Sequence, residues 1–438
     1  MTIAQMTAAM RENKLSSAEL TAQYLAAIKK SGRLNAVIEI NPDAAEIAQR
    51  LDSSADKNGP LHGIPVLIKD NISTCDRMHT AAGSVALAGN IPPEDAPIVS
   101  KMRRAGAVIL GKTNMTEFAN YMSKKMPNGY SSRGGRTLHF FDPKSDPSGS
   151  STGSAVAVAA GLCAAAVGTE TSGSILSPAQ QAGIVGLKPT LGLLSSELII
   201  PISFTLDTAG PMCTCVEDAA LLLGVLAGKN YPVSKDAGLK GMRIGIFRNS
   251  LKDEYGAEWI NANEKLVPLM RSLGAECIEL ADHKINAGFS RAIMLYEFRF
   301  AMNRYLQSMN NPAIPQTLAE IIAYNNGHAA AALKYGQDIL INAEKKGANA
   351  LAEPEYIEAI KAREAAKATL DAVFADNNLD LIFMIEGDFR IITTGFPGIT
   401  IPIGFKSSGL PIGSFFMARR FGEQKLLQAA FAVQTKLV

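Results

Sequence analysis

Two short segments rich in serine, threonine and glycine could perform chemistry together. They are residues 148–154 and 169–174, and the uncharged, mostly apolar stretch 155–168 separates them. Glycine lets backbone N–H groups come close to a ligand, and a serine hydroxyl becomes a nucleophile once a base removes its proton. If both segments face one pocket, they place hydroxyls beside a group of backbone donors. Acyl transfer needs this arrangement to stabilise an oxyanion.

Lys69 is the candidate base for such a nucleophile. It follows the apolar run 64–68, which predicts a short buried strand, and Asp70 and Asn71 come next. A lysine at the end of a buried strand often extends to the surface, and spacing alone favours that interpretation. The alternative is a buried amine whose pKa is lowered enough for it to accept a proton. The residues by themselves leave both interpretations open.

The stretch between the two hydroxyl-rich segments predicts the element that positions them. Because 155–168 is apolar on all sides, it predicts a buried helix of up to about four turns. Ser151 or Thr152 is the candidate N-cap, and Gly161 or Gly168 is where the helix could end. A helix with a hydroxyl-rich loop at each end would hold the two loops against each other.

The rest of the chain alternates short apolar runs with longer amphipathic segments. This alternation predicts an α/β fold with a mixed β-sheet core and helices on both faces. Strands are expected at 36–40, 64–68, 107–110, 185–187, 242–247, 276–280, 381–384 and 398–403, and helices at 17–30, 42–56, 97–104, 216–226 and 258–273. Residues 284–376 are predicted to be almost wholly helical. No internal repeat or low-complexity linker interrupts the chain, so a single large domain over 1–438 is expected.

Composition excludes several classes of function. The 438 residues are 47% hydrophobic and carry a net charge of +2, which gives no electrostatic basis for binding nucleic acid or a membrane surface. The five cysteines lack zinc-site spacing, so neither a metal nor a cofactor is expected. The N-terminus has no signal-peptide pattern and no run approaches 18 apolar residues, which favours a cytoplasmic enzyme.

Two further motif matches are interpreted as coincidences. Residues 106–113, GAVILGKT, fit the phosphate-binding pattern, but the four apolar residues within it predict a strand rather than a phosphate-wrapping loop. Residues 149–153, GSSTG, fit the nucleophile-elbow pattern, but the polar residues before them cannot form the core strand that such an elbow needs.

The ordered motifs resemble the amidase signature family of Ser-Ser-Lys amide hydrolases. They are GIPVLIKDNI, the serine-rich loop, GTETSGSI, GIVGLKPT and DTAGPM, all within about residues 60–230, and the resemblance resumes from Pro397 to the end. The resemblance implies a single amidase signature domain that cleaves the C–N bond of a carboxamide through an acyl-enzyme and releases ammonia. It also implies that the 284–376 helical insert lies near the active site.

The family's catalytic residues can be carried over to this sequence. Lys69 matches the catalytic lysine, Ser150 the bridging serine whose peptide bond is cis in the family, and Ser174 the nucleophile. The oxyanion hole corresponds to the backbone N–H groups of Thr171, Ser172, Gly173 and Ser174. Candidate substrate-binding residues are Tyr121, Met122 and Ser151.

Departures from the common family pattern bear on the substrate. They are Ser148, Thr152, Glu170, Ser172 and Leu176. Most of them resemble the branch that contains bacterial peptide amidases, which implies a peptide C-terminal amide or a small aryl or alkyl amide as substrate. No cluster of charged residues is visible that would select a charged substrate. We expect a monomer or homodimer.

Two alternatives remain for the function. The first is the A-type subunit of a glutamyl-tRNA(Gln)-like amidotransferase, which keeps the same triad but passes ammonia to a partner. The second is a non-catalytic binding protein on the same scaffold. The sequence departures count against the first, and the presence of all three reactive residues counts against the second.

Overall fold

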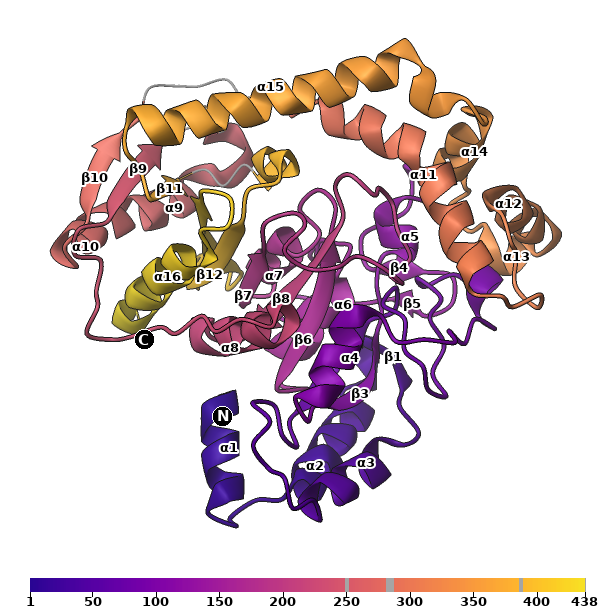
Figure 1. Ribbon diagram of the computed structural model, residues 1–438, viewed down its shortest axis with the longest axis horizontal. Coiled ribbons are helices and arrows are strands. Elements are labelled where there is room, and N and C mark those ends of the chain that lie inside the picture. The colour runs from indigo at the N-terminus through magenta and orange to yellow at the C-terminus, as the bar shows by residue number, and fades with distance from the viewer. Residues whose placement is uncertain (249–251, 281–286, 386–388, 438) are drawn as a thin grey trace.

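A large mixed sheet lies at the centre of the molecule (Figure 1). The computed structural model describes residues 1–248, 252–280, 287–385 and 389–437. Within these ranges, eleven strands form one sheet in the order β1-β3-β2-β6-β8-β7-β12-β13-β11-β9-β10. Its strands are β1 (Val37–Ile40), β2 (Pro65–Lys69), β3 (Val108–Thr113), β6 (Ala165–Glu170), β7 (Val185–Lys188), β8 (Thr208–Cys213), β9 (Arg243–Phe247), β10 (Glu276–Glu279), β11 (Leu381–Met384), β12 (Gly398–Phe405) and β13 (Pro411–Ala418). The α/β fold with a mixed sheet is confirmed.

Helices cover both faces of this sheet. Those packed around the sheet include α1 (Ile3–Arg11), α2 (Ser17–Lys30), α3 (Ala44–Asp52), α4 (Pro97–Arg104), α6 (Thr152–Ala159), α7 (Leu176–Gln181), α8 (Val216–Ala227), α9 (Lys252–Glu264), α10 (Leu266–Ser272) and α16 (Glu423–Leu437). Side chains of β2 alternate between two cores, as those of a strand must. Val66 and Ile68 pack in the core that contains α4, α8 and α16, whereas Leu67 packs in the core that contains α2, α3 and α6.

The predicted helical region 284–376 forms a separate group of helices along one side of the sheet. It contains α11 (Phe289–Ser308), α12 (Leu318–Gly327), α13 (Ala329–Ala332), α14 (Asp338–Lys345) and the long α15 (Pro354–Asp376). Helix α15 runs along the outside of the molecule and packs against α11 (Figure 1). Residues 284–286 of the predicted region lie outside the described residues. The two-residue strands β4 (Tyr130–Ser131) and β5 (Gly135–Arg136) and the one-turn α5 (Glu117–Asn120) lie on the same side.

The predicted helix over 155–168 is only partly correct. Helix α6 is capped at Ala160, and Gly161 follows with φ +66°, a left-handed conformation that ends a helix. The second half of the stretch is strand β6, which pairs in parallel with β2 and antiparallel with β8. An apolar run buried on both faces suits a parallel strand as well as a buried helix, so sequence periodicity could not separate them.

Two other expectations have clear outcomes. The GAVILGKT match is confirmed as a strand, since residues 108–113 of it form β3 and Lys112 is buried there, donating to Thr80 Oγ1 at 2.9 Å. The single helix predicted at 258–273 is wrong, because it divides into α9 and α10 around Lys265. Pro268 lies in the first turn of α10 and has no N–H to continue the hydrogen bonds of α9.

The sheet topology brings the reactive residues together. Strands β2 and β6 run parallel, and Ile68 lies opposite Val167. Lys69 at the end of β2 therefore lies beside the end of β6, from which the 171–174 loop leads into α7. Helix α6 packs against β2 and β6, so its N-terminus places the serine-rich loop over the same sheet edge.

At Gly153, in the first turn of α6, the neighbouring backbone leaves no space for a side chain. A Cβ at this position would lie 2.2 Å from the Asn114 carbonyl oxygen and 2.4 Å from that of Ala36. We expect Gly153→Ala to lower the free energy of unfolding by about 1–3 kcal/mol, because overpacked backbone must move. Urea unfolding followed by fluorescence measures this change. Gly327→Ala is the control, since a Cβ there meets nothing within 4 Å, and equal effects of the two substitutions would contradict the prediction.

Candidate active site

Lys69 lies fully buried at the centre of a hydroxyl cluster. Its Nζ donates to Ser150 Oγ at 2.8 Å, to Ser151 Oγ at 2.9 Å, and to Thr169 Oγ1 at 2.9 Å and the Thr169 carbonyl at 3.2 Å. Of the two interpretations of Lys69 from sequence, the structure therefore supports the buried amine rather than a surface side chain. The cluster joins residues from β2, from the start of α6 and from the end of β6.

The surroundings of Lys69 favour its neutral form. Burial lowers the pKa of this amine to about 7, and the negative charges of Asp207 and Glu170 only partly oppose the shift. Near neutral pH a substantial fraction of Lys69 therefore carries a lone pair that can accept a proton. Its neighbour Ser151 donates its own hydroxyl proton to the Thr169 carbonyl at 3.0 Å, so that proton is already used. The Ser150 hydroxyl has no such second partner among the described residues.

The serine-rich loop is fixed on both sides of Ser150. The Gly149–Ser150 peptide bond is cis, the form that the family resemblance implies. The Ser150 carbonyl accepts from Thr116 N–H at 3.1 Å, and Thr152 Oγ1 donates to the Ser148 carbonyl at 2.6 Å. Ser151 occupies the N-cap position of α6, but its side chain is turned to Lys69 and makes no capping hydrogen bond.

Two hydrogen bonds join this loop to the segment that carries Ser174. Ser151 N–H donates to the Ser174 carbonyl at 3.1 Å, and the Ser148 and Ser177 hydroxyls are 2.7 Å apart. Ser174 is 9% exposed, whereas Ser150 and Lys69 are fully buried. Of the three residues, Ser174 alone can therefore be reached from solvent.

Glu170 and Asp207 hold the 171–174 loop from two sides. Glu170 Oε2 accepts from the backbone N–H groups of Ile175 at 2.6 Å and Leu176 at 2.9 Å, just after the loop. Thr171 Oγ1 donates to Asp207 Oδ1 at 2.6 Å. Between these attachments, Gly173 adopts φ +95°, which favours glycine. The loop therefore has a fixed shape before any ligand binds.

We expect Glu170→Gln to lower kcat by about 10- to 100-fold, because a hydrogen bond to a charged group contributes about 1.5–3 kcal/mol. The amide keeps one acceptor oxygen but loses the charge that holds Ile175 and Leu176 N–H. Steady-state kinetics on any amide that the wild type hydrolyses measures the change. A variant with unchanged kcat and raised KM would contradict a role for Glu170 in positioning the loop.

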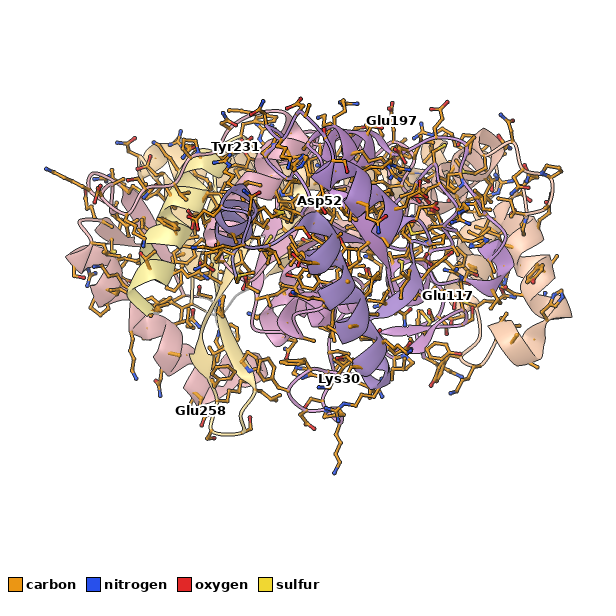
Figure 2. The ribbon with its side chains drawn as sticks, turned by 90° about the horizontal axis from the view of Figure 1, so that it is seen from below. Lys30, Asp52, Glu117, Glu197, Tyr231 and Glu258 are labelled. Carbon is orange, nitrogen blue, oxygen red and sulfur yellow. The ribbon has the colours of Figure 1, made fainter. Side chains whose placement is uncertain are left out.

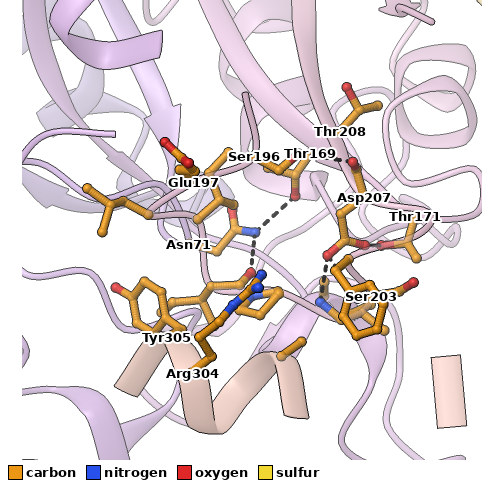
Figure 3. Close-up of a pocket in the computed structure, with 18 of the residues that line it drawn as sticks. Asn71, Thr169, Thr171, Ser196, Glu197, Ser203, Asp207, Thr208, Arg304 and Tyr305 are labelled. Carbon is orange, nitrogen blue, oxygen red and sulfur yellow. Dashed lines mark hydrogen bonds between the residues drawn. The ribbon is translucent and has the colours of Figure 1, made fainter. Parts of the chain in front are cut away.

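A cavity of about 600 Å³ adjoins this cluster (Figure 3). Asn71, Thr169 and Thr171 form its wall on the side of Lys69, and residues 196–204 and helix α11 form the other walls. Asn71 Nδ2 donates to Thr169 Oγ1 at 3.0 Å, which connects the cavity wall to the lysine cluster. The side chains of Lys69, Ser150 and Ser174 are not part of the lining itself.

The structure separates the three predicted substrate-binding residues. Ser151 contacts Lys69 directly. Tyr121 and Met122 are buried in the apolar cluster below α11, where the Tyr121 ring lies 4.9 Å from that of Phe298. Neither lines the cavity, although nearby Ala119 does. Substrate binding by these three residues stays a prediction.

Several residues of the site were not found from the sequence. Asn71 lies two residues after Lys69 in GIPVLIKDNI, and Asp207 begins DTAGPM. These matched motifs were the signal that could have found them. Three charged residues of the cavity wall gave no signal, because they come from distant segments: Glu94, Glu197 and Arg304. Over the described ranges, no three His, Cys, Asp or Glu side chains are grouped as a metal site would require.

The Amidase family model matches residues 19–385 of the chain. A probable amidase of Arabidopsis thaliana is 37% identical over 99% of this chain and 89% of its own length. The solved native peptide amidase of Stenotrophomonas maltophilia is 37% identical, with a TM-score of 0.92 over 100% of this chain and 97% of that one. The A-type subunit of the glutamyl-tRNA(Gln) amidotransferase from Prochlorococcus marinus is 32% identical over 98% of this chain and 96% of its own length.

These matches extend over nearly the whole chain. The mixed sheet with its buried lysine and serine-rich loops defines a hydrolase of the amidase class. The chain belongs to the amidase signature family and is an amidohydrolase that acts on amides. No helix in the described part of the chain is long and apolar enough to cross a membrane.

Proposed function

We propose that this protein hydrolyses a carboxamide to a carboxylate and ammonia through Lys69, Ser150 and Ser174. The observation that carries the proposal is the 2.8 Å contact between the buried Lys69 amine and Ser150 Oγ, in a loop joined by a hydrogen bond to Ser174. A base with a pKa of about 7 is matched to proton transfer near neutral pH. The exposed end of the relay, Ser174, is the residue that a substrate can reach.

The first step of the proposed reaction forms a tetrahedral intermediate on Ser174. Neutral Lys69 takes the proton of Ser150 as Ser150 takes that of Ser174, and Ser174 Oγ bonds to the amide carbon. The carbonyl oxygen becomes an oxyanion beside the backbone N–H groups of residues 171–174. Of these, Thr171, Ser172 and Ser174 N–H donate to no described group, whereas Gly173 N–H is directed at Glu170. Fixed donors aimed at developing charge stabilise the transition state.

The later steps release both products. The relay returns its proton to the amide nitrogen, the C–N bond breaks, ammonia leaves and the acyl group stays on Ser174 as an ester. Water then loses a proton to the same relay and attacks the acyl carbon, so the Ser174 ester breaks and the carboxylate departs. Each proton that Lys69 accepts is given back, and the enzyme ends in its starting state.

The substrate is proposed to be a peptide C-terminal amide or a small aryl or alkyl amide. The similarity to a solved peptide amidase supports this class. A cavity of about 600 Å³ beside the lysine cluster has room for the chain that precedes a terminal amide.

Ammonia release by the purified chain alone tests the proposal. The panel contains peptide C-terminal amides, aryl and alkyl amides, and glutamine, and size-exclusion chromatography verifies the expected monomer or homodimer. Turnover without a partner would support the proposed function. Absence of ammonia from every amide would overturn it.

An amidotransferase component is a second candidate, because the A-type subunit from Prochlorococcus marinus is 32% identical along nearly its whole length. This candidate predicts glutamine as the only productive amide and turnover only in the presence of partner subunits. Hydrolysis of a peptide amide by the isolated chain would exclude it. The third alternative, a non-catalytic binding protein, predicts that a fluorophosphonate leaves Ser174 unlabelled.

A further inference from the structure

Three free charges line the cavity beside the lysine cluster. Arg304 comes from α11, and Glu94 and Glu197 come from two separate loops. Within the described ranges, neither the Arg304 guanidinium nor the two carboxylates have a hydrogen-bond or ion-pair partner. Asp207 also lines the cavity, but its carboxylate is already occupied by Thr171 Oγ1 and by the Ile202 and Ser203 N–H groups. The cavity therefore offers one unpaired cation and two unpaired anions.

Helix α11 fixes where the cation lies. Its cavity-lining residues are Ala301, Arg304, Tyr305 and Ser308, which form one stripe along a helix. Tyr305 locks the rotation of this stripe, because its buried hydroxyl lies 3.0 Å from Ser73 Oγ and 3.1 Å from Asn90 Nδ2. Arg304 is thereby held over the cavity, and Figure 3 shows its side chain extending from α11 toward Asn71.

The two carboxylates line the same cavity as Arg304. Arg304 and both glutamates are exposed, and Glu197 lies at the edge of the molecule in Figure 2. No ion pair joins Arg304 to either of them. An arginine that shares a cavity with two free carboxylates and pairs with neither is available to a ligand. Its planar fork of N–H donors fits a carboxylate best.

We propose that Arg304 is a specificity residue that selects amide substrates carrying a carboxylate close to the scissile carboxamide. This inference rests on the proposed amide hydrolysis and names the substrate class: peptide amides with an acidic side chain in one of the last two residues. Thr169 and Thr171 form the cavity wall next to the lysine cluster. A carboxamide at Ser174 therefore directs the preceding chain toward α11, where Arg304 pairs with the acidic group.

Kinetics on matched peptides test the inference. Three N-acetylated dipeptide amides have leucine amide as the last residue and glutamate, glutamine or lysine as the residue before it. Three more have leucine first and the amide of glutamate, glutamine or lysine last. In at least one order, we expect wild-type kcat/KM for the glutamate peptide to exceed that for the glutamine peptide by roughly tenfold, as one partly exposed charged hydrogen bond allows. This preference should shrink as NaCl rises from about 0.05 to 0.5 M, because salt screens the pair.

Substitutions assign the preference to Arg304. Arg304→Gln should remove the preference for the glutamate peptide, while its kcat/KM for the glutamine peptide stays within about threefold of the wild-type value. Arg304→Glu should have its highest kcat/KM on the lysine peptide. Arg291→Gln is the matched control, an exposed arginine on the same helix outside the cavity, and should keep the preference. Equal wild-type rates on the glutamate and glutamine peptides, or a uniform loss in Arg304→Gln, would overturn the inference. Turnover of the glutamine peptide in either case would leave the proposed hydrolysis intact. Silence on all six peptides would overturn this inference, and the proposed hydrolysis would fall with it only if the aryl and alkyl amides also released no ammonia.

Discussion

Replacing Ser174 by alanine should abolish amide hydrolysis, with kcat lower by about 10⁴- to 10⁶-fold, the range seen when a covalent nucleophile is removed. Ser174 is the one member of the Lys69, Ser150 and Ser174 set that solvent reaches, and its carbonyl is held by Ser151 N–H at 3.1 Å. Alanine keeps that backbone hydrogen bond and removes only the reacting oxygen. The loss should therefore appear in kcat without unfolding, and ammonia release measures it.

Covalent labelling separates a lost nucleophile from a lost fold. A fluorophosphonate should label the wild type once and leave Ser174→Ala unlabelled, with mass spectrometry locating the adduct. Ser272→Ala is the control, since this serine is exposed at the end of α10, away from the site, and it should retain both labelling and turnover. Full activity of Ser174→Ala would assign the nucleophile to another residue.

The grouping of Lys69, Ser150 and Ser174 could be predicted from sequence, because the chemistry that we propose for them restricts their residue types. A relay of a lysine and two serines tolerates few residue types, so its motifs stay recognisable even where Glu170 and Leu176 depart from the common pattern. The strand that carries Lys69 was equally visible, because the PVLIK of β2 is a short apolar run with two β-branched side chains.

Features that depend on tertiary context were not predictable in the same way. Strand β6 contains AAVGTE, whose alanines favour a helix, and pairing with β2 and β8 overrides that local preference. The charges at Glu94, Glu197 and Arg304 lie in segments far apart in the chain, and only the folded arrangement of α11 over the sheet edge places them around one cavity. Neither feature leaves a periodic trace in the sequence.

In the mechanism that we propose, the electrostatics of Lys69 set the pH dependence of amide hydrolysis. Burial lowers the pKa of this amine from 10.5 to about 7, and the negative charges of Asp207 and Glu170 raise it again in part. As a base, Lys69 works only when it is neutral. Activity should therefore be lost as pH falls below about 7, where the amine is protonated, and should level off above it.

We expect Lys69→Met to lower kcat/KM by about 10²- to 10⁴-fold, the usual contribution of a general base. The wild-type plot of kcat/KM against pH, from about pH 5 to 9, should rise tenfold per pH unit on its acidic side, and the residual activity of Lys69→Met should lack this acidic limb.

Asp207→Asn is the more specific test, because it removes a charge that raises the pKa of Lys69. Its acidic limb should consequently move to lower pH. A limb that stays in place in Asp207→Asn and persists in Lys69→Met would mean that another group titrates there, and Lys69 would then have to act as a fixed hydrogen-bond donor to Ser150.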